Sequence, residues 1–134
     1  MKRLLSFVFV CLLCLSLCSC GSNVKNAKIL QVKSELYSQE DIEKAVNTVI
    51  RRFDMRMNNC ILNEICYAGD DVTTEHQEWA DRYDADEAIV LDSEFFVQRS
   101  DGAASLNEGS TYYWIWILVR TSGGKWKLVD YGFK

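Results

Sequence analysis

Residues Thr111 to Arg120, with the sequence TYYWIWILVR, constrain the fold more than any other segment of this chain. Successive side chains of a β-strand point to opposite faces. One face of this segment would carry Tyr112, Trp114, Trp116 and Leu118, and the other Tyr113, Ile115, Ile117 and Val119. A strand that is apolar on both faces needs cover on both sides. The segment therefore predicts an inner strand of a covered sheet.

The rest of the pattern predicts two helices and three more strands. Apolar side chains recur at helical spacing from Ile42 to Met57, behind Ser38 as N-cap. A second helix is expected to start at Thr73 or Thr74 and to end before Asp84. The further strands are expected at 60–67, 87–98 and 126–133, the last after a Gly-Gly hairpin. This order, α-β-α-β-β-β, predicts an α+β domain with two helices on a mainly antiparallel four-stranded sheet.

The N-terminus predicts a secretory signal at residues 1–19. Two basic residues precede an uncharged apolar run at 4–17. That run is shorter than the about 20 residues of a transmembrane helix and is typical of a signal peptide. It leads to Cys20, which follows the small Ser19. Cys18 is a rival processing site, but the bulky Leu17 precedes it.

The ending Leu-Cys-Ser-Cys-Gly resembles the lipobox of bacterial lipoproteins, with Cys20 in the place of the lipidated cysteine. The resemblance implies that a diacylglyceryl group is attached to Cys20, which becomes the new N-terminus. Two or three acyl chains give durable membrane attachment, whereas one chain binds marginally. A plain secreted protein is the alternative. Residues 20–36 would then form the lipidated N-terminus and a tether, and residues 37–134 a single domain.

Within the tether, the apolar patch Ile29 to Val32 has two interpretations. It could add a marginal edge strand to the sheet, but the polar and basic residues around it favour disorder or loose packing.

Charge and cysteine usage exclude several classes of function. Residues 20–134 carry thirteen basic and nineteen acidic side chains, a net charge of −6. This balance argues against nucleic acid as a partner, and against docking on anionic lipid head groups beyond the anchor itself. Cys60 and Cys66 on one strand would lie about 20 Å apart, whereas a disulfide needs less than about 7 Å. We expect no disulfide, and with His76 as the single histidine we expect no metal site and no cofactor.

Several runs resemble a family of small exported lipoprotein domains of Gram-positive bacteria. They are YSQEDIEKAV, CILNEICYAGDD, EWADRYDADEAIVL, YWIWILVR and GGKWKLVDYGF, and they span residues 37–134. The element order is similar to the cone-shaped α+β fold of the nuclear-transport-factor-two-like superfamily. That superfamily includes ketosteroid isomerase, scytalone dehydratase and non-enzymatic binding domains. The resemblance implies a curved, cone-like sheet, while fold analogy does not transfer function.

Two functions from different classes follow. The first is a membrane-anchored extracytoplasmic lipoprotein that acts as a non-catalytic binding or interaction module, for an unknown protein or small-molecule ligand. Its candidate surface is aromatic: Phe96, Tyr112, Trp114 and Trp116. Core packing under the helices, or a homodimer through the sheet face, would explain the same residues.

The alternative function is a small cone-fold isomerase or dehydratase acting on an apolar substrate. Such an enzyme needs an acid–base group and an oxyanion donor in an apolar cavity. The chain offers Asp92, Glu94 or Asp130 as base, His76 as its partner, and Tyr112, Tyr113 or Tyr131 as donor. No spacing among these residues indicates a shared site, so no catalytic residue is predicted.

Overall fold

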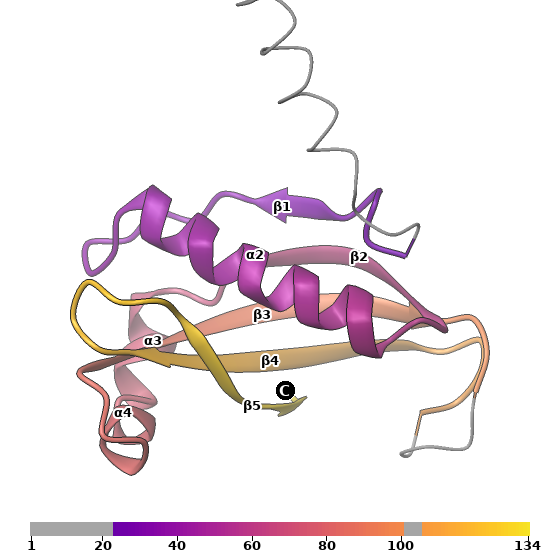
Figure 1. Cartoon of the computed structure of the whole chain (residues 1–134). Helices are drawn as coiled ribbons and strands as arrows, with labels where there is room; N and C mark the ends of the chain where they lie inside the picture. The colour runs from indigo at the N-terminus through magenta and orange to yellow at the C-terminus, as the bar shows by residue number, and fades with distance from the viewer. Residues whose placement is uncertain (1–22, 101–105) are drawn as a thin grey trace, which may run out of the picture.

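The computed structural model describes residues 23–100 and 106–134. They form one five-stranded mixed sheet with helices packed against it (Figure 1). The strands are β1 (Lys28–Leu30), β2 (Cys60–Tyr67), β3 (Glu87–Val97), β4 (Thr111–Arg120) and β5 (Lys127–Phe133), and the helices are α2 (Gln39–Arg56), α3 (Asp70–Glu75) and α4 (Glu78–Arg82). The predicted α+β class is confirmed, with one strand and one helix more than expected. The predicted signal and Cys20 lie outside the described residues.

The sheet runs in the order β1-β2-β3-β4-β5, and neighbouring strands follow one another in sequence. β1 is parallel to β2, and the other three pairs are antiparallel. β4 is an inner strand between β3 and β5, as its two apolar faces predict.

Helix α2 lies across one face of the sheet and forms the main core there (Figure 1). Its N-cap is Ser38, whose Oγ accepts the Asp41 N–H at 3.1 Å, as predicted. Its buried stripe consists of Ile42, Ala45, Val46, Val49 and Phe53. The stripe packs on the inward side chains of β2, β3 and β4, so hydrophobic burial fixes the helix on the sheet.

The opposite face of the sheet is covered at one end by α3 and α4. Ala80 of α4 packs with Ala88 of β3 and Val119 of β4 in a second, smaller core. This cover explains why both faces of β4 are buried near its C-terminal end.

The single helix predicted after Thr73 or Thr74 is wrong, because two short helices replace it. α3 begins earlier, at Asp70, and Thr73 is buried in it. There the Thr73 Oγ1 accepts the Val90 N–H at 3.2 Å. Between the helices, the Gln77 side chain exchanges two hydrogen bonds with the backbone of Ala88. Thr73 and Gln77 thus bond to backbone groups of β3 that lie beyond the end of β2. A single helix with Thr73 as its N-cap would not place both side chains at this strand.

Residues 28–30 form an edge strand, so the expectation of disorder or loose packing is wrong for this segment. β1 pairs with β2 through the register Lys28↔Glu64 to Leu30↔Cys66. Just before it, Val24 is buried in the main core. Three residues of parallel pairing give a weak local signal, so tertiary contacts with β2 decide the outcome.

Arg120 at the end of β4 fixes the N-terminal end of α2. Its guanidinium donates to both carboxylate oxygens of Asp41, at 3.0 and 3.2 Å, and to the carboxylate of Glu87. The same group lies 4.2 Å from the ring centroid of Trp126, whose indole N–H donates to the Asp41 carbonyl at 3.0 Å. The first turn of α2 is therefore tied to β3, β4 and the segment before β5.

Candidate functional site

An aromatic wall runs from the core to the β5 edge of the sheet. The inward rings of Trp114 and Trp116 neighbour each other on β4, with centroids 5.7 Å apart. Phe95 meets Trp114 edge-on at 4.9 Å, from β3. On the other side, Tyr131 of β5 stacks on Trp114 at 5.3 Å and is 48% exposed. The aromatic wall, formed by Phe95, Tyr112, Trp114, Trp116 and Tyr131, is therefore buried on the β3 and β4 side and accessible at Tyr131.

The structure brings three of the four predicted aromatic residues to this wall. Tyr112, Trp114 and Trp116 share its face, but Phe96 lies on the opposite face, where it pairs with Thr111. Its neighbour Phe95 takes the expected place, 5.8 Å from Tyr112. Trp114 and Trp116 are buried, so much of the predicted surface is core packing.

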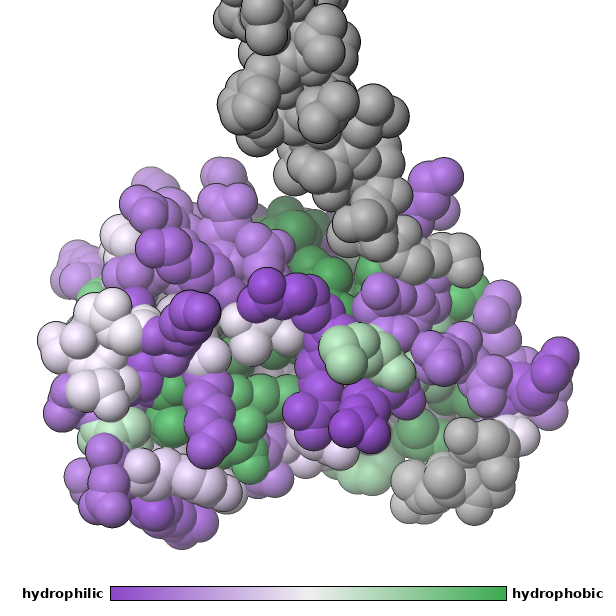
Figure 2. Space-filling view, in the orientation of Figure 1, coloured by the Kyte–Doolittle hydropathy of each residue, from purple (hydrophilic) through white to green (hydrophobic). Residues whose placement is uncertain are grey.

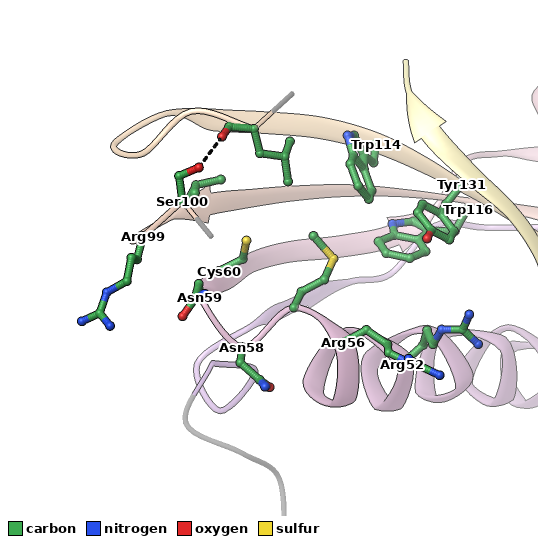
Figure 3. A pocket seen from close by; sticks show the side chains of 13 residues that line it. Arg52, Arg56, Asn58, Asn59, Cys60, Arg99, Ser100, Trp114, Trp116 and Tyr131 are labelled. Atoms are coloured by element: carbon green, nitrogen blue, oxygen red, sulfur yellow. Dashed lines mark hydrogen bonds between the residues drawn. The ribbon is translucent and has the colours of Figure 1, made fainter. Parts of the chain in front are cut away.

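A pocket of about 300 Å³ opens between this wall and the C-terminal end of α2 (Figure 3). Trp114, Trp116 and Tyr131 line one side of it, and Arg52 and Arg56 lie on the helix opposite. The remaining lining comes from the turn after α2 and from the segment around the β3–β4 connection: Met57, Asn58, Asn59, Cys60, Val97, Arg99, Ser100 and Leu106. The space-filling view shows hydrophobic patches between polar side chains on the face that carries α2 and β5 (Figure 2).

The cationic side of the pocket follows from helix geometry. Arg52 and Arg56 are four residues apart, so they lie on the same face of α2. Within the described residues, the ion pairs involve Lys44, Arg120 and Lys134, so neither of these two arginines has a carboxylate partner there. Arg99 stands at the far margin and points away from the aromatic rings (Figure 3). Arg56 also suits the negative end of the helix dipole.

The indole N–H of Trp114 is a buried donor without a partner among the described atoms. The residue is 8% exposed and lines the pocket. Trp116 shows the usual arrangement, because its N–H donates to the Ser93 Oγ at 2.7 Å. A buried donor left unpaired costs about 1–3 kcal/mol. A ligand acceptor that reached Trp114 would recover this free energy.

The carboxylates considered as catalytic bases lie away from this pocket. Asp92 and Glu94 are on the outer face of β3, where Asp92 forms an ion pair with Lys134 at 3.1 Å. Asp130 is exposed on β5. Among the described residues, none of these three carboxylates lines the pocket.

The other acid–base candidates are also elsewhere. His76 ends α3, where its Nδ1 lies 2.8 Å from the Val72 carbonyl oxygen. Tyr113 is on the outer face, and its hydrogen bond to Glu94 raises the pKa of its phenol. Tyr131 is the one proposed oxyanion donor that lines the pocket. The ring of Tyr112 lies near those of Phe95 and Phe133, and its hydroxyl accepts the Asn107 N–H at 2.7 Å.

The two cysteines of the domain lie on opposite faces of β2. A register irregularity between Leu62 and Glu64 shifts the alternation of side chains. As a result Cys60 is buried in the core and Cys66 pairs with Asp92 on the outer face. Neither forms a disulfide with another described residue. Burial is the main cause that raises the pKa of the Cys66 thiol, and the charge of Asp92 adds to it.

Arg52 and Arg56 of the site were not predicted from the sequence. The spacing of Arg52 and Arg56 in the last turns of a predicted helix was an available signal, because it places two cations on one face. Their position opposite Trp116 depends on the packing of α2 on the sheet, which spacing does not specify.

Two further kinds of site are not found in the described part of the chain. Its His, Cys, Asp and Glu side chains form no group of three that could hold a metal ion. No helix within residues 23–100 and 106–134 has the length and apolarity needed to cross a membrane.

Comparison of the chain with protein-family models, with curated proteins and with solved structures finds no match.

Proposed function

We propose that this chain is a membrane-anchored extracytoplasmic lipoprotein whose domain is a non-catalytic binding module. In this proposal Cys20 carries the lipid, and the pocket between α2 and the aromatic wall holds a ligand. We also propose that the domain belongs to the lipoprotein domain family that it resembles and has a cone-shaped fold. The α+β class of the structure is compatible with both.

The observation that carries the binding proposal is the composition of the pocket. It combines accessible aromatic area with a buried, unpaired indole N–H and with cations that have no described carboxylate partner. Pockets that bind small molecules are mainly apolar with a few convergent polar groups. The isomerase or dehydratase alternative lacks comparable support, since its proposed bases lie on the outer face or on β5.

The anchor is tested by the substitution Cys20→Ser in the full chain, with Cys18→Ser as the matched control. We expect Cys20→Ser to release the protein or leave it unprocessed, and to remove the diacylglyceryl mass from the N-terminal peptide. Cys18→Ser should change neither. Unchanged membrane retention and mass in Cys20→Ser would refute lipidation at this residue.

The pocket is tested by native mass spectrometry of the full chain extracted from its own membrane. We expect a non-covalent small-molecule adduct that is lost in Tyr131→Ala and weakened in Trp114→Phe. Tyr83→Ala is the matched control, because Tyr83 is 45% exposed, close to the 48% of Tyr131, and stacks on Trp79 of α4 instead. An adduct that all variants retain equally, or no adduct at all, would count against this pocket.

A further inference from the structure

We propose that the arginine-bearing rim of the pocket faces the membrane and binds the phosphate of an anionic phospholipid in that bilayer. The rim is defined by Arg52 and Arg56, which lie on one face of α2 and line the pocket. This inference rests on the proposed function, because it needs both the anchor at Cys20 and the pocket. It adds the class of ligand and the orientation of the domain.

The anchor site is only a few residues away from a residue that bonds to the pocket lining. The Asn23 Nδ2 donates to the Met57 carbonyl at 3.2 Å, and the Asn23 carbonyl accepts the Leu62 N–H at 2.9 Å. Met57 is part of the pocket lining. Cys20 is three residues before Asn23, and three residues span at most about 11 Å. A lipid on Cys20 would therefore hold this end of the pocket close to the bilayer surface.

The acidic charge of the domain is concentrated at one end. Residues 70–86 contain seven acidic side chains and one basic side chain, a net charge of −6. This equals the net charge of residues 20–134, so the rest of that chain balances twelve acids with twelve bases. The acidic segment forms α3 and α4, which lie at the opposite end of the molecule from the C-terminus of α2 (Figure 1). Repulsion between the acidic side chains and anionic head groups therefore concerns the end with α3 and α4, and not the end with the pocket.

The local environment of the rim is compatible with an anion. Asp54 lies between Arg52 and Arg56 in sequence, but it is two residues from each, and side chains at that spacing do not share a helix face. Two further exposed cations are close in sequence: Arg51 precedes Arg52, and Lys25 is two residues after Asn23.

The side chains of the site match the chemistry of a phospholipid head group. Guanidinium groups bind phosphate through two parallel hydrogen bonds. Each basic residue near an anionic membrane surface strengthens binding by about fivefold. Tryptophan and tyrosine are enriched at the level of the head groups because their rings are amphipathic. The rim and the exposed end of the aromatic wall offer both features together.

The experiment uses the full lipidated chain in nanodiscs of phosphatidylcholine, with or without phosphatidylglycerol. Hydrogen exchange is followed in peptides that cover residues 56–60 and 97–100. We expect exchange there to slow at least fivefold when phosphatidylglycerol is present. The double substitution Arg52→Gln/Arg56→Gln should abolish the slowing, since two arginines contribute about 25-fold. Arg51→Gln, on the same helix but outside the pocket lining, and Arg82→Gln on α4 should retain most of it.

The other outcomes would overturn the proposal in distinguishable ways. Equal exchange in both bilayers would show that head-group charge is irrelevant. Slowing by inorganic phosphate in phosphatidylcholine nanodiscs, as large as that by phosphatidylglycerol, would identify a soluble anion as the ligand. An equal loss in Arg51→Gln would indicate a diffuse basic surface. Missing lipid mass on Cys20 would remove the anchor itself, whereas a retained anchor and adduct with no lipid dependence would refute this inference alone.

Discussion

Replacing Arg120 with methionine should weaken the domain far more than removal of an exposed ion pair. The Arg120 side chain is 10% exposed and contacts two carboxylates that are about 30% exposed. Methionine keeps much of the apolar stem but lacks the guanidinium that lies over the Trp126 ring. It leaves Asp41 and Glu87 without their shared cation.

The expected magnitude follows from this burial. Removing one member of a fully buried ion pair costs about 3–5 kcal/mol. Asp41 and Glu87 retain access to water, which lowers that cost, while hydrogen bonds to charged groups contribute about 1.5–3 kcal/mol. We therefore expect Arg120→Met to lower the free energy of unfolding by about 2–3 kcal/mol. Arg120→Lys should recover part of this loss, because lysine keeps the charge but not the planar fork.

Urea denaturation followed by circular dichroism measures these differences. Lys44→Gln is the matched control, since the pair Lys44–Glu40 also joins residues of α2 but has side chains 63% and 77% exposed. Surface pairs contribute about 0–1 kcal/mol, so this control should differ little from the parent chain. The triple variant Arg120→Met/Asp41→Asn/Glu87→Gln should regain stability relative to Arg120→Met, because it removes the unpaired charges as well.

A loss in Arg120→Met no larger than that in Lys44→Gln would refute the argument. It would mean that apolar packing alone holds the first turn of α2 on the sheet. A triple variant as unstable as Arg120→Met would instead show that the guanidinium acts through stacking on Trp126 and not through the carboxylates.

Three further predictions concern other polar groups. Ser93→Ala should lower the free energy of unfolding by about 1–3 kcal/mol in urea titrations and shift the tryptophan emission, because the buried Trp116 N–H loses its acceptor; Ser122→Ala, at an exposed turn, should do neither. Hydrogen bonds from the Ser34 Oγ, the Glu35 N–H and Tyr67 hold the pKa of Asp70 below its ordinary value. The ionised Asp70 side chain therefore stabilises the fold fully above the unfolded pKa of about 3.9, and this stabilisation is lost as pH falls through the lower folded pKa. Asp70→Asn should show a shallower loss of stability from about pH 5 to pH 2, and an unchanged pH profile would contradict this. Burial and Asp92 raise the pKa of the Cys66 thiol. Maleimide labelling of Cys66 near pH 8 should therefore be slower in native protein than in urea-unfolded protein, and Asp92→Asn should speed the native reaction. Equal native and unfolded rates would refute the prediction.

The elements with strong periodicity could be predicted from the sequence. The bounds of β2 and β4 match the expected 60–67 and 111–120, and the Ser38 cap of α2 is found where predicted. These elements carry their information locally, in alternation, helical spacing and a capping side chain. The start of the second helix was predicted wrongly because the Thr73 side chain bonds to a residue far away in sequence. Thr73 has the sequence context of a helix cap, but its hydroxyl accepts a hydrogen bond from the backbone of β3.

The candidate site could be predicted only in part for the same reason. Alternation on β4 correctly groups Trp114 with Trp116, and it cannot choose between Phe95 and Phe96 on β3, since that choice depends on the strand register. The arginines of the pocket belong to a helix whose placement over the wall is a tertiary property. Sequence patterns thus identify one wall of the pocket and leave the other to the fold.

The two ends of α2 are held by different means, and this explains where the pocket lies. Charge-assisted hydrogen bonds from Arg120 fix the first turn, while beyond the last turn Asn23 donates to the Met57 carbonyl. Tyr131 of β5 remains half exposed while its neighbour Trp116 is buried. Substitutions at the pocket can therefore change its surface without disturbing the ion pairs that fix the helix. Because Asn23 bonds both to Met57 of the pocket lining and to the buried Leu62 of β2, any load on an anchor at Cys20 would reach the pocket and the core together.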